Sequence, residues 1–220
     1  MRILRTTLIF IAVIVIHGCT KPYKPPIIEP ADSAFLGFHP SSIDVNETNL
    51  VMIHGMCHQD NEWVEKSSSR LADHFGMVKQ ETELLFKDNS SNVQVFKTII
   101  GNDNYSINLY GIVYGPSTLP FKRFLCKDVS KESDICPTIS YTRVRASLNS
   151  KLKDNLLNNC LADAIIYLGD LGNIIRKGVK NSLLSIITDI ENSNSPVYIL
   201  SESLGSKIIR DGFYPVSTDG

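Results

Sequence analysis

Ser203 is the residue of this sequence best placed to act as a nucleophile. Ser201 and Gly205 stand two positions before and two positions after it, the apolar run 197–200 precedes it, and residues 207–213 can form a helix. A strand, a turn with small residues on both sides of a serine, and a helix are the context of a nucleophile elbow, whose tight turn brings strand and helix close together. The alternative is a plain strand-to-helix turn rich in small residues.

Acyl transfer also needs hydrogen-bond donors for the oxyanion. The elbow supplies one donor, the backbone N–H of Leu204. The second donor should come from the loop after an earlier strand, and here Gly55 and Met56 follow soon after the apolar run 50–53. Because Gly55 lets the backbone turn, the N–H of Met56 can face Ser203.

Residues 51–56 and 201–205 together resemble the α/β-hydrolase superfamily, in its lipase and esterase branch. The resemblance is specific at these two motifs and extends, through alternating strands and helices, over residues 50–215. The fold class that it implies is α/β, with a mostly parallel sheet flanked by helices. The strands that follow the elbow in that family are lacking here.

The resemblance also implies the roles of the site residues. Ser203 would be the nucleophile and Met56 and Leu204 the oxyanion donors, with an ester or thioester as substrate. In that family an acid and a histidine follow the serine, yet the seventeen residues after Ser203 contain no histidine. The histidines of the chain all precede it: His17, His39, His54, His58 and His74.

A serine without a base keeps a hydroxyl pKa far above 7 and is a poor nucleophile. Three explanations compete: the chain is a fragment of a longer hydrolase, it is a non-catalytic relative, or an upstream histidine has become the base. His54 and His58 lie near the expected oxyanion loop and are the candidates for such a base. The fragment explanation fits the abrupt end of the sequence best.

The same loop offers two other kinds of chemistry. His54, Cys57 and His58 could begin a zinc site, but no second cluster completes a ligand set, so no metal and no cofactor are predicted. Cys57 or Cys160 as a thiol nucleophile is disfavoured, because a thiol in an exported protein tends to be oxidised or buried.

Short-range patterns predict the elements that would position these residues. Asp60 or Asn61 can cap a helix that ends near Phe75, with Gly76 placed to terminate it. Two β-rich runs, 93–100 and 105–114, are separated by strong turn residues, which predicts a hairpin or a pair of neighbouring strands.

The C-terminal half is predicted to alternate helices with a strand. Residues 121–142 are expected to leave the core as an excursion. Apolar residues at spacings of three and four predict amphipathic helices over 150–168 and 174–190, both packing their apolar faces in the core. The run 197–200 is expected to be a buried strand.

Residues 1–18 are typical of a secretion signal. Two arginines precede the apolar run 8–16, whose nine residues are about half of the roughly 20 that a membrane helix needs. The run 16–19, Ile-His-Gly-Cys, resembles the bacterial lipobox, so cleavage would leave Cys19 as a lipidated N-terminus. An ordinary cleaved signal and an uncleaved anchor are the alternatives. By the same resemblance, Thr20 after the cysteine favours the outer membrane.

Export into an oxidising compartment agrees with the remaining cysteines, which are even in number. Cys126 with Cys136 is the preferred disulfide, because both lie in a polar segment where a short loop can close. Cys57 and Cys160 would then form either a second bridge or two buried thiols.

Composition predicts one ordinary globular domain. The 220 residues are 43% hydrophobic and 20% charged, with a net charge of -1. The 22 basic and 23 acidic residues form no long blocks, which excludes an electrostatic footprint for nucleic acid. Five prolines within residues 19–49 predict a tether that joins the lipidated end to a folded domain at 50–220.

The sequence therefore predicts an exported, membrane-anchored serine esterase or lipase-like hydrolase, placed at the outer membrane and facing the periplasm. Its predicted partners are the membrane, through Cys19, and an acyl ester or lipid ligand. The sequence does not identify a protein partner. The alternative function is a non-catalytic lipoprotein that uses the hydrolase scaffold to bind a lipid or a protein.

Overall fold

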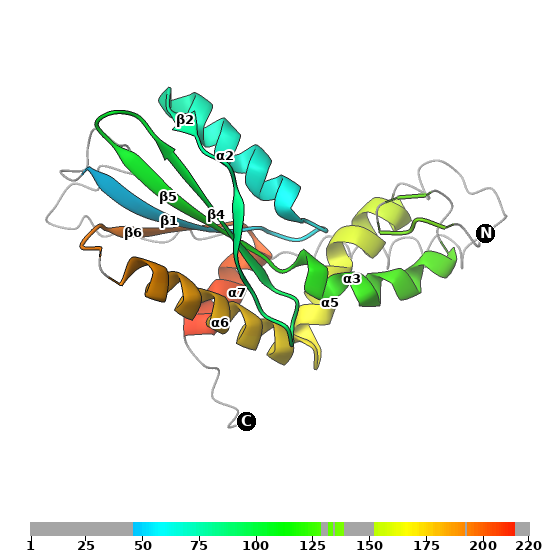
Figure 1. Cartoon of the computed structure of the whole chain (residues 1–220). Helices are drawn as coiled ribbons and strands as arrows, with labels where there is room; N and C mark the ends of the chain where they lie inside the picture. The colour runs from blue at the N-terminus through cyan, green and yellow to red at the C-terminus, as the bar shows by residue number, and fades with distance from the viewer. Residues whose placement is uncertain (1–45, 129–131, 134, 139–151, 192, 214–220) are drawn as a thin grey trace, which may run out of the picture. The chain divides into compact units, whose positions relative to one another are not determined.

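A sheet of six strands lies at the centre of the described structure (Figure 1). The computed structural model describes residues 46–128, 132–133, 135–138, 152–191 and 193–213, all within the unit 43–220. The strands are β1 Glu47–Ile53, β2 Val78–Lys79, β3 Glu83–Lys87, β4 Gln94–Gly101, β5 Ser106–Val113 and β6 Val197–Ser201. Their order is β2-β4-β5-β1-β6, and β3 also pairs with β4.

The sheet is mixed, so the predicted α/β class is confirmed but the prediction of a mostly parallel sheet is wrong. Only β1 makes parallel pairs, with β5 and with β6, while β4 is antiparallel to β2, β3 and β5. The cause is the turn after Gly101, which is far too short for the crossover that parallel strands require. Within it, the side chain of Asn102 accepts hydrogen bonds from the N–H groups of Asn104 and Tyr105, which closes the predicted hairpin.

Helices pack on both faces of the sheet. They are α2 Asn61–Phe75, α3 Gly115–Phe124, α5 Ala162–Leu168, α6 Gly172–Ile190 and α7 Leu204–Phe213, with a 3-10 turn η3 Leu125–Asp128 and a π-helix η4 Leu152–Leu161. The predicted caps of α2 are confirmed: Asp60 accepts from the Glu62 N–H, and Gly76 has a φ of 63°. The predicted helix over 174–190 corresponds to α6.

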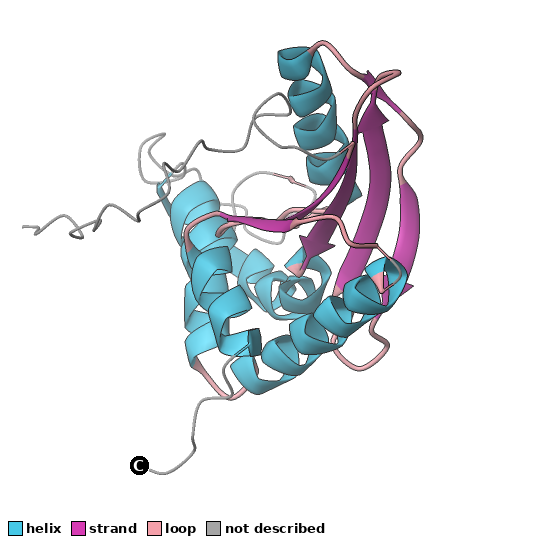
Figure 2. Ribbon diagram, turned by 90° about the vertical axis from the view of Figure 1, so that its left-hand side faces the viewer, coloured by secondary structure: helices cyan, strands magenta, loops and turns pink. Residues whose placement is uncertain are grey.

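The alternation of side chains along β5 divides the core into two layers. Tyr110 and Ile112 join the cluster formed with α5, α6 and α7, whereas Gly111 faces Val64 of α2. Figure 1 shows α2 on one side of the sheet and α6 and α7 on the other, and Figure 2 shows the twist of the strands between them. The sheet is thus covered on both faces in its centre.

The edge strand β6 is less covered than the sequence predicts. Val197, Ile199 and Leu200 expose 48%, 44% and 56% of their surface, so the prediction of a buried strand is wrong. The physical reason is position, because among the described residues β6 pairs with β1 alone and ends the sheet. An apolar run of this kind does not distinguish a central strand from an edge strand.

The predicted helix over 150–168 exists in its described part, but its apolar stripe does not face the core. It begins as the π-helix η4 and continues as α5. Six of its seven leucine and isoleucine side chains expose 40% to 72% of their surface, at positions 152, 156, 157, 161, 165 and 168. The buried side of α5 instead carries Tyr167, which joins the core cluster, and Asp163, which pairs with Lys122 of α3. The apolar stripe predicted from the sequence therefore lies on the exposed side of this helix.

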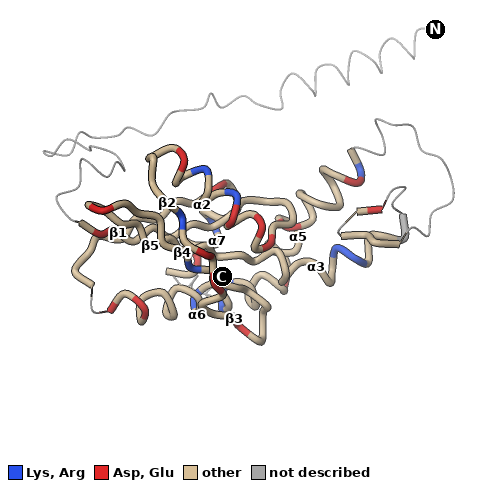
Figure 3. The backbone as a smooth tube through the Cα atoms, turned by 45° about the horizontal axis from the view of Figure 1, so that its top comes forward, with Lys and Arg blue, Asp and Glu red and all other residues tan. Residues whose placement is uncertain are grey.

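The signal, Cys19 and most of the tether lie outside the described residues, as do 139–142 of the predicted excursion. Within the described part, no helix is long and apolar enough to cross a membrane. Lys, Arg, Asp and Glu are interspersed along the chain without long runs of one sign (Figure 3).

Candidate functional site

Ser203 occupies a sharp turn between β6 and α7. The strand ends at Ser201 and the helix begins at Leu204, so only two residues separate them. The backbone of Ser203 has a φ of 47°, in the left-handed region, and the residue is exposed. For a residue other than glycine such a conformation costs of order 1–3 kcal/mol, and it persists only where the surroundings impose it.

Two glycines bring the turn against the end of β1. A Cβ on Gly205 would overlap the carbonyl oxygen of His54 and lie 3.1 Å from that of Ile53. A Cβ on Gly55 would lie 3.3 Å from the Cβ of Ser203. These contacts follow from the parallel pairing of β1 with β6, because parallel strands end at the same edge of a sheet. The two motifs singled out in the sequence are therefore neighbours in space.

His54 is a fixed part of this edge. It is fully buried, and burial lowers its pKa from 6.5 to about 3, so the imidazole is neutral. Its Nδ1–H donates to the carbonyl of Gly55 over 2.8 Å, and its Nε2 accepts from the N–H of Tyr114 over 3.1 Å. Both ring nitrogens are occupied, so His54 in this arrangement has no free nitrogen for the Ser203 hydroxyl.

Tyr114 and Gly115, which directly follow β5, contact the loop that follows β1. The Tyr114 ring stacks on His54 at 4.0 Å between centroids, and its hydroxyl donates to the Gly55 carbonyl. Burial raises the pKa of Tyr114, so the hydroxyl keeps its proton. Gly115 lies so close to the carbonyl of Gln59 that a Cβ would overlap it. Loop 54–59 is thereby held at both ends by the residues that follow β5.

The two predicted oxyanion donors lie on the two segments that meet here. Met56 follows Gly55, and in the described part of the chain its N–H donates to no backbone carbonyl. Leu204 is the first residue of α7, and the N–H groups of a first helical turn have no acceptor within the helix. Leu204 directly follows Ser203, and Gly55 packs against Ser203. The arrangement can present backbone N–H groups to an oxygen atom near the serine.

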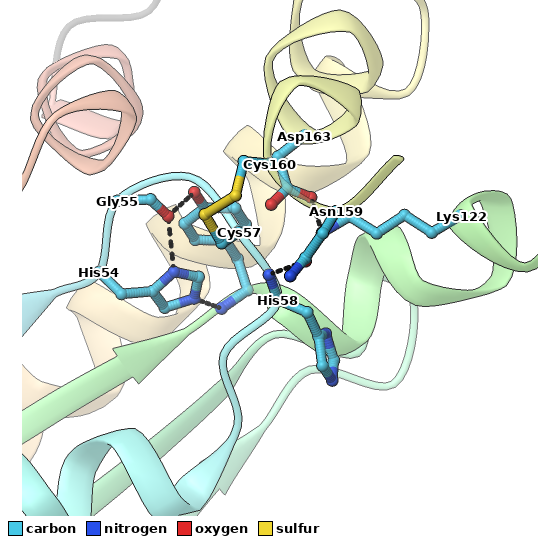
Figure 4. Close-up of a disulfide and its surroundings, with 9 residues drawn as sticks. His54, Gly55, Cys57, His58, Lys122, Asn159, Cys160 and Asp163 are labelled. Carbon is cyan, nitrogen blue, oxygen red and sulfur yellow. Dashed lines mark hydrogen bonds and ion pairs between the residues drawn. A yellow bond between two sulfur atoms is a disulfide. The ribbon is translucent and has the colours of Figure 1, made fainter. Parts of the chain in front are cut away.

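The other described histidines lie farther from this contact. His58 is half-buried, and Figure 4 shows its imidazole pointing away from Gly55. Burial and the charge of Lys122 lower the pKa of His58, against smaller opposing effects of Asp60 and Asp163. His74 is exposed in the last turn of α2. His17 and His39 lie outside the described residues.

The described part of the chain contains two disulfides, and one of them involves the loop after β1. Cys126 pairs with Cys136, which confirms the preferred pairing, and Cys57 pairs with Cys160, the bridge that the sequence left open. The Cys57–Cys160 bond joins loop 54–59 to η4 (Figure 4). Because Cys57 is oxidised, it supplies no thiolate for a metal or for nucleophilic attack. Among the described residues no group of three or more His, Cys, Asp or Glu could hold a metal ion.

A buried ion pair joins α3 to α5, the helix that continues η4. Lys122 Nζ lies 2.7 Å from Asp163 Oδ1, and both side chains are fully buried. Burial lowers the pKa of Lys122, and the Asp163 carboxylate opposes this shift. Removing one partner of such a pair leaves an uncompensated charge, so each residue depends on the other.

Sequence reasoning missed the residues that hold the loop, namely Tyr114, Gly115 and Asn159. Tyr114 and Gly115 carry a usable signal, because an aromatic residue ends the predicted strand 105–114 and a glycine directly follows it. Asn159, whose side chain accepts a hydrogen bond from the His58 N–H, carries none. It lies 101 residues away in the sequence, within a helix.

Comparisons of the chain with known protein families, with characterised proteins and with solved structures give no match.

Proposed function

We propose that this domain is a serine hydrolase that acts on acyl esters through Ser203. The observation that carries the proposal is the left-handed backbone of Ser203, exposed at a two-residue turn and packed against Gly55. Strain of this kind concentrates at functional sites, because there the surroundings impose a conformation that the chain would otherwise avoid.

The reaction would proceed through an acyl-enzyme. The hydroxyl oxygen of Ser203 attacks the ester carbonyl carbon, its proton passes to a base, and the Met56 and Leu204 N–H groups stabilise the oxyanion. The carbon–oxygen bond to the alcohol then breaks, and the alcohol leaves with a proton. Water hydrolyses the acyl-serine and restores the hydroxyl. One oxyanion donor contributes about 10²–10³ in rate in well-studied hydrolases.

The base is the part of the proposal that needs a residue beyond the elbow. His54 is held by Gly55 and Tyr114. His58, whose lowered pKa keeps its imidazole neutral but also makes it a weaker base, would have to turn its ring toward Ser203. A base on a segment outside the described residues is the other route.

The proposed setting is the outer membrane, with the domain in the periplasm and the acyl groups of Cys19 in the bilayer. Several acyl chains on one residue hold a protein on a membrane, since each buried methylene contributes about 0.8 kcal/mol. An anchored enzyme would meet acyl esters of lipids at high local concentration. A lipid ester is therefore the proposed substrate class.

One observation favours a second candidate, a non-catalytic protein that binds a lipid or a protein partner on the same scaffold. Of the histidines near the elbow, His54 makes two structural hydrogen bonds and the ring of His58 points away from Gly55. Without a base the serine would keep its proton, and the two N–H donors would bind an oxygen atom of a ligand without turnover.

Covalent labelling with a fluorophosphonate separates the two candidates. The mature chain is incubated with the probe, and the adduct is located by mass spectrometry in wild type, Ser203→Ala and Ser206→Ala. Ser206 is a matched control, because it is an exposed serine of α7, three residues after Ser203. We expect labelling of wild type and Ser206→Ala and none of Ser203→Ala.

Labelling that persists in Ser203→Ala would refute Ser203 as the nucleophile. No labelling of the wild type would leave the binding protein as the better candidate. Loss of labelling in His58→Ala, with unchanged thermal stability, would identify His58 as the base.

A further inference from the structure

Helix η4 is attached to the proposed oxyanion loop through two neighbouring residues. Cys160 forms the disulfide with Cys57, and Asn159 Oδ1 accepts a hydrogen bond of 2.8 Å from the N–H of His58. Figure 4 shows both attachments side by side, between the loop that follows His54 and the helix. Consecutive residues of the helix thus hold consecutive residues of the loop.

The held residues stand immediately after Met56, whose N–H is a proposed oxyanion donor. Cys57 has a φ of 80°, one of three non-glycine residues with a positive φ in the described part of the chain. A cysteine does not adopt this conformation without a constraint. The bond to Cys160 is the covalent constraint on Cys57, and the Asn159 hydrogen bond fixes the next peptide group.

The other attachments of the loop lie at its two ends. His54 and Gly55 are held by Tyr114, and Gln59 packs on Gly115. These contacts leave the backbone between Gly55 and Gln59 to be fixed by Cys57 and His58. The chain direction directly after Met56 therefore depends on η4.

We propose that the Cys57–Cys160 disulfide and Asn159 are positioning residues, which hold the oxyanion loop so that the Met56 N–H faces the Ser203 site. The inference rests on the proposed function and adds its dependence on the redox state of one bond. With the bond intact, Cys57 keeps its left-handed backbone and the Met56 N–H stays in place. With the bond broken, Cys57 relaxes to a negative φ and the loop moves away from the donor geometry.

The redox step needs a dithiol as reductant. One thiolate of the dithiol attacks a sulfur of the Cys57–Cys160 bond, one cysteine leaves as a thiolate, and a mixed disulfide forms. The second thiolate of the dithiol then attacks this mixed disulfide and releases the other cysteine. Two electrons and two protons pass to the protein, and the dithiol becomes a cyclic disulfide.

The experiment compares two double variants of the full mature chain, Cys57→Ala with Cys160→Ala, and Cys126→Ala with Cys136→Ala. The second variant is the matched control, because it also removes one of the two described disulfides. One readout is the second-order rate constant for labelling of Ser203 by a fluorophosphonate, at a temperature at which both variants are folded. The other is hydrogen exchange of the peptide that contains residues 55–59.

Loss of the Cys57–Cys160 bond should slow labelling about tenfold or more, a part of the effect of losing one oxyanion donor. It should also speed hydrogen exchange in residues 55–59. The control variant should match wild type in both readouts. Dithiothreitol should act like the first double variant on wild type and on the control, and have no effect on the first double variant itself. Asn159→Ala should have a smaller effect in the same direction.

The outcomes separate this inference from the proposed function. If wild type is labelled and the Cys57–Cys160 variant is labelled at the same rate, the positioning role is refuted while the function stands. If wild type is not labelled, the proposed function fails, and hydrogen exchange then tests the positioning role. Unchanged exchange in residues 55–59 of the Cys57–Cys160 variant overturns the inference. Faster exchange confined to that variant supports it. Equal effects of both double variants would also overturn it, since they would indicate a general loss of stability.

Discussion

The contact between α7 and the end of β1 predicts opposite effects for two glycine-to-alanine changes on one helix. Gly212 lies near the end of α7, and a Cβ there would make ordinary contacts of 3.5 Å with Leu183 and Val179. Alanine is favoured over glycine within a helix by about 0.5–1 kcal/mol, so Gly212→Ala should stabilise the domain by that amount.

Gly205→Ala adds the same methyl group at the other end of the helix, where there is no room for it. The new Cβ would overlap the carbonyl oxygen of His54, far inside the 3.0 Å below which a neighbouring group must move. That group is backbone, and His54 is buried with both ring nitrogens bonded, so it cannot turn aside. Overpacking of this kind costs about 1–3 kcal/mol or more, which exceeds the gain in helix propensity.

Urea unfolding followed by far-ultraviolet circular dichroism measures both effects. We expect Gly205→Ala to lower the free energy of unfolding by about 1–3 kcal/mol, and Gly212→Ala to raise it, with similar m-values. In a thermal scan each kcal/mol should shift Tm by about 2–4 °C. Labelling of Ser203 should slow in the first variant only, because the elbow must move away from Gly55. A Gly205→Ala protein as stable as wild type would refute the close packing of α7 on β1.

Two further predictions concern buried ionisable side chains. The pKa of His54 is lowered in the folded state, so His54 of the unfolded chain takes up a proton first as the pH falls. The free energy of unfolding should therefore decrease below about pH 6.5, by up to about 1.4 kcal/mol per pH unit. Urea titrations from pH 7 to 5 should show a steeper loss in wild type than in His54→Gln, and equal slopes would contradict the neutral buried imidazole. Lys122→Met should destabilise the domain by about 3–5 kcal/mol in thermal unfolding, because it leaves Asp163 buried without a counter-charge, and adding Asp163→Leu should restore most of the loss. A single variant as stable as wild type would show that the pair is not desolvated.

Much of the fold could be predicted from the sequence because the signals are local. The Asp60 cap and the Gly76 terminus lie at the two ends of one helix, and each acts through residues within a few positions. The turn after Gly101 acts in the same way. The predictions that failed, a buried β6 and a buried apolar stripe on 150–168, depend on which element lies beside which.

The same difference between local signals and long-range contacts applies to the candidate site. The small residues around Ser203 and the glycine at position 55 were visible in the sequence, since a strained turn and a close approach require them. Tyr114, Asn159 and the Cys57–Cys160 bond were not assigned, because their contacts span about 60 to 103 residues. No short pattern contains both partners of such a contact.

The sequence by itself therefore determined the local elements, the serine turn and the glycines that it needs. Only the tertiary structure decided that the two motifs meet, because the parallel pairing of β1 with β6 places their ends at one edge of the sheet. It also decided that the loop after β1 is held by η4, and that His54 is a buried structural residue with both nitrogens bonded. Burial and long-range pairing produce these properties, and neither is a function of neighbouring residues in the sequence.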